Sequence, residues 1–234
     1  MNYPLRNGIL SFLLDGDAEF LADTLKEIYA TYPRSVCNCL MNLLGTHDTE
    51  RILTVLGEGN ERNPDESNDV LAYQRLDARK LQRGISLLKI AAAIQYTVYG
   101  VPSVFYGDEA GLEGYHDPFC RRPYPWGKEN RELLEFYKIL GKIRKEHSVF
   151  SDGDFRVTFA QDAVLAYVRE NCTEKITVIA NMNDEPMEYH QDMPSVDLLN
   201  GNRYEGSVAP HDVCILFTKK QKEQNNNGIS SEYV

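Results

Sequence analysis

The sequence predicts an α/β fold in its first part and a small all-β sandwich in its second. Up to about residue 148, helical patterns alternate with two continuous apolar runs, at residues 37–44 and 101–106. Continuous apolar runs are typical of parallel strands that are covered on both faces. After about residue 150 the apolar residues recur with a period of two, in short runs split by turn residues, which is typical of a β-sandwich.

Each helix of the first part has its own local signal. Residues 8–16 and 17–33 read as two helices, and the second is opened by Asp17. A third helix is expected from residue 78, with apolar residues at helical spacing and an end at Gly100. Residues 128–147 form an amphipathic pattern with acidic residues early and basic residues late, which matches the helix dipole. Polar residues 57–77 are expected to form a long loop.

The change of periodicity divides the chain. We expect a partial α/β domain at residues 1–148, a β-sandwich at residues 149–218 and a disordered tail at residues 219–234, which are polar and low in complexity. The first part contains two clear strands only. Because each buried strand of a parallel sheet pairs on both sides, a complete sheet needs further strands.

Composition excludes several classes of protein. The net charge of −10 leaves no basic surface for nucleic acid or for an anionic membrane. No apolar run approaches the ~20 residues that span a bilayer, and the first residues do not resemble a signal peptide. The five cysteines are dispersed without a CxxC pair, so neither a zinc site nor a disulfide framework is indicated. We therefore expect a cytoplasmic protein with reduced thiols.

Polar side chains follow both predicted strands. In parallel α/β folds, ligands bind where strands end. The first strand delivers His47 and Asp48, and the second delivers Asp108 and Glu109. The chain contains two further His-Asp pairs, at residues 116–117 and 211–212, which follow no predicted strand. The strand context therefore singles out His47 and Asp48 as candidate site residues.

Structural roles compete with these functional ones. Asp48 is also a fair N-cap for a helix that follows it, and the two readings have equal weight. For Asp108 and Glu109, a buried ion pair with Arg or Lys is favoured over catalysis. The aromatic residues of the next loop form either a sugar-stacking face or ordinary loop packing, and these are Tyr115, Phe119, Tyr124 and Trp126.

Long motifs resemble those of one enzyme family. The segments "NLLGTHDTER" and "GVPSVFYGDEAGLEGYHDPFCRRPYPW" are similar to the C-terminal part of glycoside hydrolase family 13, in its neopullulanase, cyclomaltodextrinase and maltogenic amylase branch. "NYPLR" resembles the exit from the sixth barrel strand, and "VDLLNGNRY" resembles the C-terminal β-domain. The resemblance implies strands seven and eight of a (β/α)8 TIM barrel with their helices, followed by the β-sandwich.

The resemblance also implies roles for individual residues. His47 and Asp48 would contact the sugar at the cleavage point, and Asp48 would stabilise the transition state. Asp117 and Arg121 would bind a neighbouring glucose unit, and Arg51 would support the pocket wall as part of the substrate-binding set. Hydrogen bonds to sugar hydroxyls that strengthen in the transition state suit these residue types.

Retaining glycoside hydrolysis needs a nucleophilic carboxylate and a second carboxyl as acid/base. The family carries these groups on strands four and five, which have no counterpart here. We therefore expect part of an α-glucan hydrolase that is inactive alone and binds α-glucan oligosaccharides, with the missing part of the barrel as a possible separate partner chain. The alternatives are a maltooligosaccharide-binding module and a non-functional gene remnant. No cofactor or metal is expected, although full-length relatives often bind calcium.

Overall fold

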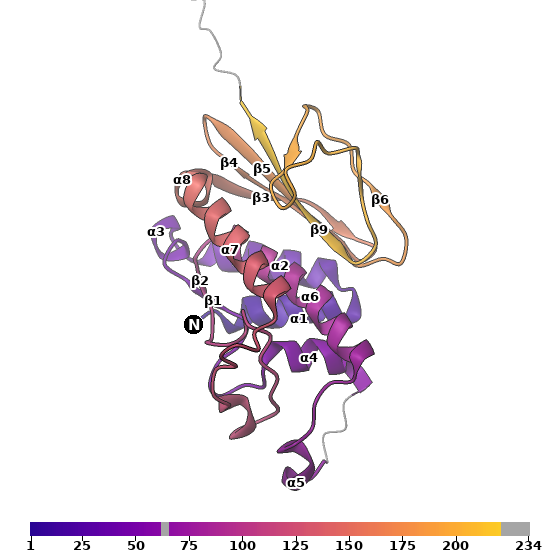
Figure 1. The fold of residues 1–234 in the computed structure, drawn as a ribbon. Helices are drawn as coiled ribbons and strands as arrows, with labels where there is room; N and C mark the ends of the chain where they lie inside the picture. The colour runs from indigo at the N-terminus through magenta and orange to yellow at the C-terminus, as the bar shows by residue number, and fades with distance from the viewer. Residues whose placement is uncertain (62–65, 221–234) are drawn as a thin grey trace, which may run out of the picture.

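The computed structural model describes residues 1–61 and 66–220, and its first part is a group of helices beside a short parallel sheet (Figure 1). The elements of this part are, in order, α1 (Tyr3–Asp15), α2 (Ala18–Thr31), α3 (Arg34–Cys37), β1 (Met41–Leu43), α4 (Ile52–Glu58), the 3-10 turn η1 (Gly59–Glu61), α5 (Asn68–Leu71), α6 (Ala78–Thr97), β2 (Val101–Ser103), the 3-10 turn η2 (Phe119–Arg121) and α7 (Arg131–Glu146).

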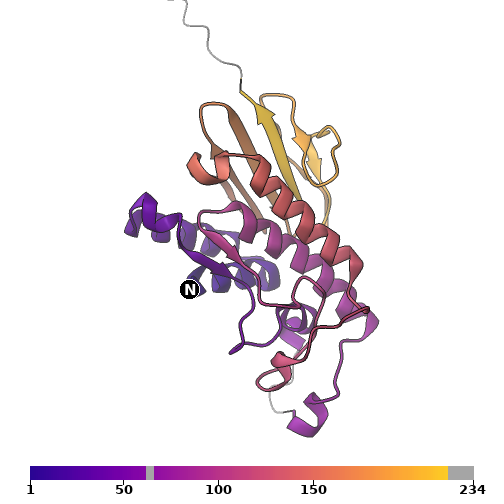
Figure 2. The same ribbon diagram turned by 60° about the vertical axis from the view of Figure 1, so that its left-hand side comes forward.

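The second part is a β-domain that packs on the helices of the first part (Figure 2), chiefly on α2 and α6. Its elements are α8 (Val149–Asp152), β3 (Asp154–Gln161), β4 (Val164–Glu170), β5 (Glu174–Asn181), β6 (Met187–Glu188), β7 (Val196–Asp197), β8 (Ser207–Val208) and β9 (Asp212–Lys219). Five of these strands form an antiparallel sheet in the order β3-β4-β5-β9-β7, and β6 pairs with β8. The period-two pattern after residue 150 therefore predicted the strand content correctly, except that it missed β8.

Side chains cap the long helices at their first turns. Asp17 accepts a hydrogen bond from the backbone N–H of Phe20 at 2.9 Å, as expected for the start of α2. Asp77 caps α6 in the same way through the N–H of Lys80 at 2.9 Å. In α7, Glu132 lies in the first turn and Arg144 lies in the last, so the charges match the helix dipole.

Both strands of the parallel sheet are shorter than the apolar runs predicted. Residue 37 ends α3 rather than beginning a strand, and only residues 41–43 and 101–103 pair, in parallel. The expectation of cover on both faces is wrong at Met41 and Val101, which are exposed. Met41 and Val101 are register partners on one face of the sheet, and the sheet has no third strand among the described residues whose side chains could pack over that face.

The end of α6 is set by the approach of the chain to β1. The helix ends at Thr97 rather than at Gly100, and Gly100 follows with φ of 107°. A Cβ atom at this position would lie 2.5 Å from the carbonyl oxygen of Leu40. Gly100 therefore permits a close backbone contact between the strands, which is a different role from the helix end that was expected.

The polar stretch at residues 57–77 is only partly a loop. It includes the end of α4, η1 and α5, and residues 62–65 lie outside the described residues. Most of the tail expected to be disordered, residues 221–234, also lies outside them. No helix in the described ranges is long and apolar enough to cross a bilayer.

One hydrophobic core joins the helices to the sheet. Leu21 of α2 and Ile94 of α6 belong to the same buried cluster as Tyr167 of β4 and Ile215 of β9. A smaller cluster fills the opposite face of the sheet beneath β6 and β8, and it includes Val164, Ala166, Ile179, Val208 and Leu216. The sheet is thus covered on both faces, by helices on one and by the β6–β8 ribbon on the other.

A buried arginine also connects the two parts. The Arg169 guanidinium donates to the carbonyl oxygen of Thr97 at 3.0 Å and to that of Val149 at 2.9 Å. Burial lowers the pKa of Arg169 to about 10, and the Tyr99 ring lies 4.4 Å from its guanidinium carbon. The packing is therefore continuous across the boundary that the sequence predicts at residues 148 and 149.

Candidate functional site

The loop after β1 presents His47 and Asp48 to solvent. The backbone N–H of Asp48 donates to Oγ1 of Thr46 at 3.2 Å, and the N–H of Thr46 donates to Oγ1 of Thr49 at 3.0 Å. These bonds tighten the turn directly after the strand. The two side chains point outward as a result, with 59% and 61% of their surfaces exposed.

Arg121 joins these residues to the loop after β2. Its Nη2 lies 3.7 Å from Oδ1 of Asp48, and its Nε lies 2.7 Å from Oδ1 of Asp117. Nε2 of His47 lies 3.1 Å from Oδ1 of Asp48. Four of the five predicted site residues therefore form one group, which we call the polar cluster: His47, Asp48, Asp117 and Arg121.

Backbone contacts hold the two loops of the polar cluster together. Nε of Arg121 donates to the carbonyl oxygen of His47 at 3.1 Å, and Sγ of Cys120 lies 3.4 Å from the same oxygen. The carbonyl of Cys120 accepts from Nε of Arg51 at 2.6 Å. A backbone carbonyl leaves no trace in a residue pattern, so the sequence could not reveal these links.

Arg51, the fifth predicted residue, is completely buried beneath the polar cluster. It donates to the Tyr106 carbonyl as well as to that of Cys120, and its Nη1 lies 3.1 Å from Oδ1 of Asp108. The ring of Phe105 packs against its guanidinium, with the guanidinium carbon 4.2 Å from the ring centre. Arg51 thus connects the loops from inside, which suits the supporting role that the resemblance implies.

Asp108 is the counter-ion of Arg51 in the interior. Burial raises the pKa of Asp108 to about 7, although the Arg51 guanidinium opposes that shift. Gly45 lies so close that a Cβ there would be 2.3 Å from Oδ2 of Asp108. The predicted buried ion pair is confirmed at Asp108, whose carboxylate is 2% exposed. It is wrong at Glu109, which accepts from the N–H of Gly107 and has no ion pair with another described residue.

The alternative role of Asp48 as a helix cap is wrong. Helix α4 begins at Ile52, and its N-cap position is Arg51, with no side-chain cap. Asp48 precedes that position by three residues, because the turn at residues 46–49 separates it from the helix. Its carboxylate instead faces His47 and Arg121 within the polar cluster.

The aromatic residues of the second loop have divided roles. Tyr115 is buried and its hydroxyl donates to Glu58 at 2.7 Å, so it belongs to the loop packing. Trp126 is 81% exposed, and its ring centre lies 4.5 Å from that of Tyr124. Of the four predicted aromatic residues, Trp126 offers the most open face for stacking.

The described residues contain no group of three or more His, Cys, Asp or Glu side chains that could hold a metal ion. All five cysteines are free thiols. The polar cluster consists of two carboxylates, an imidazole and a guanidinium. These groups can form hydrogen bonds with a polyhydroxylated ligand directly.

Known proteins are similar to this chain in sequence and in fold. No family model matches the chain. An amylopullulanase from Thermoanaerobacter thermohydrosulfuricus is 39% identical over 189 residues, which cover 76% of this chain and 12% of that protein. A cyclomaltodextrinase from Bacillus sp is 33% identical over 191 residues, which cover 79% of this chain and 30% of that protein. The chain belongs to the α-amylase family, glycoside hydrolase family 13.

Solved structures of α-amylase-family enzymes agree with this assignment. The ligand-free cyclic alpha-maltosyl-(1→6)-maltose hydrolase from Arthrobacter globiformis superposes with a TM-score of 0.70 at 26% identity, over 94% of this chain and 44% of that one. The maltogenic amylase from S. marinus gives 0.71 at 28% identity, over 94% of this chain and 28% of that one. The fold is therefore a portion of a (β/α)8 barrel followed by a β-domain, and the chain spans less than half of each of these relatives.

Proposed function

We propose that this chain supplies the sugar-holding side of a retaining α-glucan hydrolase that acts on α-1,4 or α-1,6 bonds of maltooligosaccharides, cyclodextrins, pullulan or starch. The polar cluster carries this proposal. It gathers two carboxylates, an imidazole and a guanidinium on the exposed loops that follow two parallel strands. Active sites of barrel enzymes form at this edge of the sheet.

Asp48 and His47 contact the glucosyl ring at the cleavage point in this proposal. Asp48 is the residue that stabilises the developing positive charge of the transition state. Asp117 and Arg121 hold the next glucose unit, and Arg51 keeps both loops in place from below. The supporting observation is that Arg121 contacts Asp48 and Asp117 and also the backbone of His47, so it fixes the spacing of the whole set.

The nucleophile and the acid/base are not among these residues. Asp108 is buried against Arg51, and Glu109 uses Oε2 to accept from the N–H of Gly107 at 2.9 Å. Neither is placed to attack a bound sugar. The chain alone is therefore proposed to bind α-glucans without cutting them. Its location in the cytoplasm, expected from the sequence, stays a prediction.

The unpaired sides of β1 and β2 support a need for further strands. The two strands pair only with each other in the described part of the chain, and Met41 and Val101 are exposed along them. An apolar strand edge of this kind is a site for pairing with another strand. We propose that a further polypeptide segment, from a longer chain or from a separate one, completes the barrel there.

The test is an assay of sugar release by the purified chain. Maltotriose, cyclodextrin and pullulan should all remain intact. Turnover that persists after Asp48→Asn, in a preparation free of host amylase, would contradict the proposed role of Asp48. A maltooligosaccharide-binding module is the second candidate function, because every member of the polar cluster lies within this chain. Binding without turnover in the assembled protein would favour it.

A further inference from the structure

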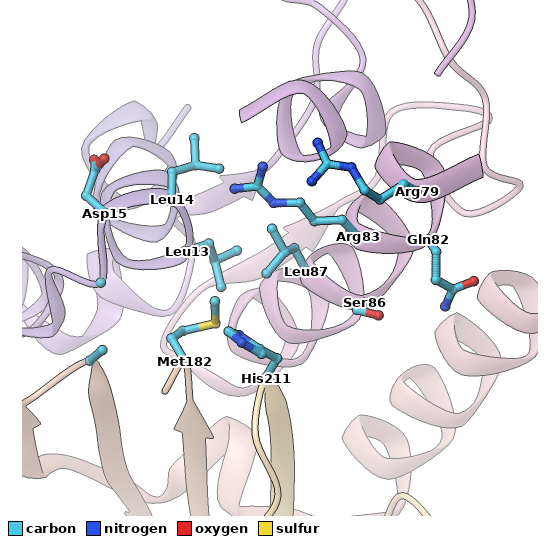
Figure 3. Close-up of a pocket in the computed structure, with 12 residues that line it drawn as sticks. Leu13, Leu14, Asp15, Arg79, Gln82, Arg83, Ser86, Leu87, Met182 and His211 are labelled. Atoms are coloured by element: carbon cyan, nitrogen blue, oxygen red, sulfur yellow. The ribbon is translucent and has the colours of Figure 1, made fainter. Parts of the chain in front are cut away.

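A cavity of about 810 Å³ lies where α1, α6 and the β-domain meet (Figure 3). Its lining comes from the end of α1, from one side of α6 and from the ends of β-strands. The strand residues are Ala163 before β4, Met182 after β5 and His211 before β9. All of these elements are separate from the polar cluster, so the cavity is a distinct site.

The floor of this cavity is apolar. Figure 3 shows Leu13 of α1, Leu87 of α6 and Met182 pointing toward one another from three different elements. Leu14 extends the apolar wall along α1. Pockets of roughly 300–1,000 Å³ with mainly apolar walls and a few charged groups are typical of sites for small organic ligands.

Two arginines lie one helical turn apart on the α6 side of the cavity. Arg79 is engaged, since its Nη2 lies 3.1 and 3.0 Å from the two carboxylate oxygens of Glu61. Arg83 has neither a carboxylate within ion-pair distance nor a hydrogen-bond acceptor among residues 1–61 and 66–220. Within the described ranges, one guanidinium without an acceptor therefore lines an apolar cavity.

Packing holds the Arg83 guanidinium in place. A Cβ atom at Gly59 would lie 2.7 Å from Nη1 of Arg83, so the glycine lets the planar group lie against the backbone. Gly59 also has φ of 55°, which disfavours a side chain. Two other charged or titratable groups of the lining are already engaged: His211 lies 2.8 Å from Asp184, and Asp15 accepts from Asn60 at 3.2 Å.

We propose that this cavity binds a small amphiphilic carboxylate, with an unbranched apolar chain on the floor and its carboxylate on Arg83. The floor formed by Leu13, Leu87 and Met182 suits an alkyl chain and offers little to a polyhydroxylated sugar. A planar guanidinium with two free N–H groups matches a carboxylate bidentately. The site is thus independent of the proposed α-glucan function.

The test is a titration of the whole chain with octanoate, followed by nuclear magnetic resonance of isotope-labelled methionine methyl groups. The Met182 methyl signal should shift to saturation, while that of Met41, on the unpaired edge of β1, should not. 1-Octanol has the alkyl chain without the charge and should bind at least about threefold more weakly than octanoate. Octylamine, which carries a positive charge, should bind more weakly than 1-octanol.

Variants separate the charge from the cavity. Arg83→Gln should reduce the affinity for octanoate to that for 1-octanol and leave 1-octanol unchanged. Arg79→Gln is the matched control and should have the smaller effect, because Glu61 already engages Arg79. Ser86→Phe, which places a ring in the cavity lining and narrows the cavity, should weaken the binding of both ligands. Equal affinity for octanoate and 1-octanol in the unmodified chain, or an unshifted Met182 signal, would overturn the proposal.

Discussion

Nη1 of Arg51 lies 3.1 Å from Oδ1 of Asp108, with both side chains almost completely out of contact with solvent. This buried ion pair joins the loop after β1 to the loop after β2. The same guanidinium holds the Cys120 carbonyl, next to Arg121 of the polar cluster. The exposed side chains of the polar cluster are therefore positioned by an ion pair that is itself buried.

Removing the buried cation should be costly. Arg51→Met is expected to lower the free energy of unfolding by ~3–5 kcal/mol, because it leaves the Asp108 carboxylate buried without its partner. Urea denaturation measures the change. The matched control is Arg121→Met, whose ion pairs are about half exposed, with an expected loss of at most ~1 kcal/mol. Equal losses in the two variants would contradict the importance given to Arg51.

Asp108 should make the stability depend on pH. Burial raises its pKa to about 7 in the folded chain, above the unfolded value, so the folded state binds the proton more tightly. This contribution to stability is therefore complete at low pH and is lost as pH rises from about 4 through about 7. The unfolding free energy of the native chain minus that of Asp108→Asn should therefore decrease as pH rises over that range, because only the native chain loses this contribution. A difference that grows with pH would contradict the raised pKa.

Gly45 should tolerate no side chain. Gly45→Ala places a methyl group 2.3 Å from Oδ2 of Asp108, and the displacement is expected to cost about 1–3 kcal/mol. Gly141→Ala, in the middle of α7, meets nothing within 4 Å and is expected to stabilise by about 0.5–1 kcal/mol. Thermal unfolding of the two variants should move in opposite directions. A neutral Gly45→Ala would show that the carboxylate has room to shift.

The helices and the β-domain should unfold together. Their core is continuous, and Arg169 bonds to carbonyl groups of both parts. Fluorescence and far-ultraviolet circular dichroism of residues 1–234 should report one transition in urea. Residues 149–218 expressed alone should bind an apolar dye, since Leu165, Tyr167 and Ile176 would face solvent. Two separate transitions would instead show that the two predicted domains unfold independently.

The sequence predicted those features that local patterns encode. The Asp17 cap and the dipole-matched α7 needed only neighbouring residues. The grouping of His47 with Asp117 needed the family motifs. The sequence failed where distant contacts decide: Gly100 is required by the carbonyl of Leu40, and Arg169 bonds to Thr97, 72 residues away. The cavity at Arg83 depends on α1, α6 and three strand ends that are far apart in the chain.

The most direct test of the polar cluster is a calorimetric titration of the purified chain with maltotriose. The unmodified chain should bind with a dissociation constant on the order of 1 mM, as expected for a site with only part of its subsites. Asp48→Asn and Arg121→Gln should abolish the heat, and Asp184→Asn, which alters an exposed His211 pair elsewhere, should leave it unchanged. No heat with the unmodified chain, or the same heat with Asp48→Asn, would contradict the account.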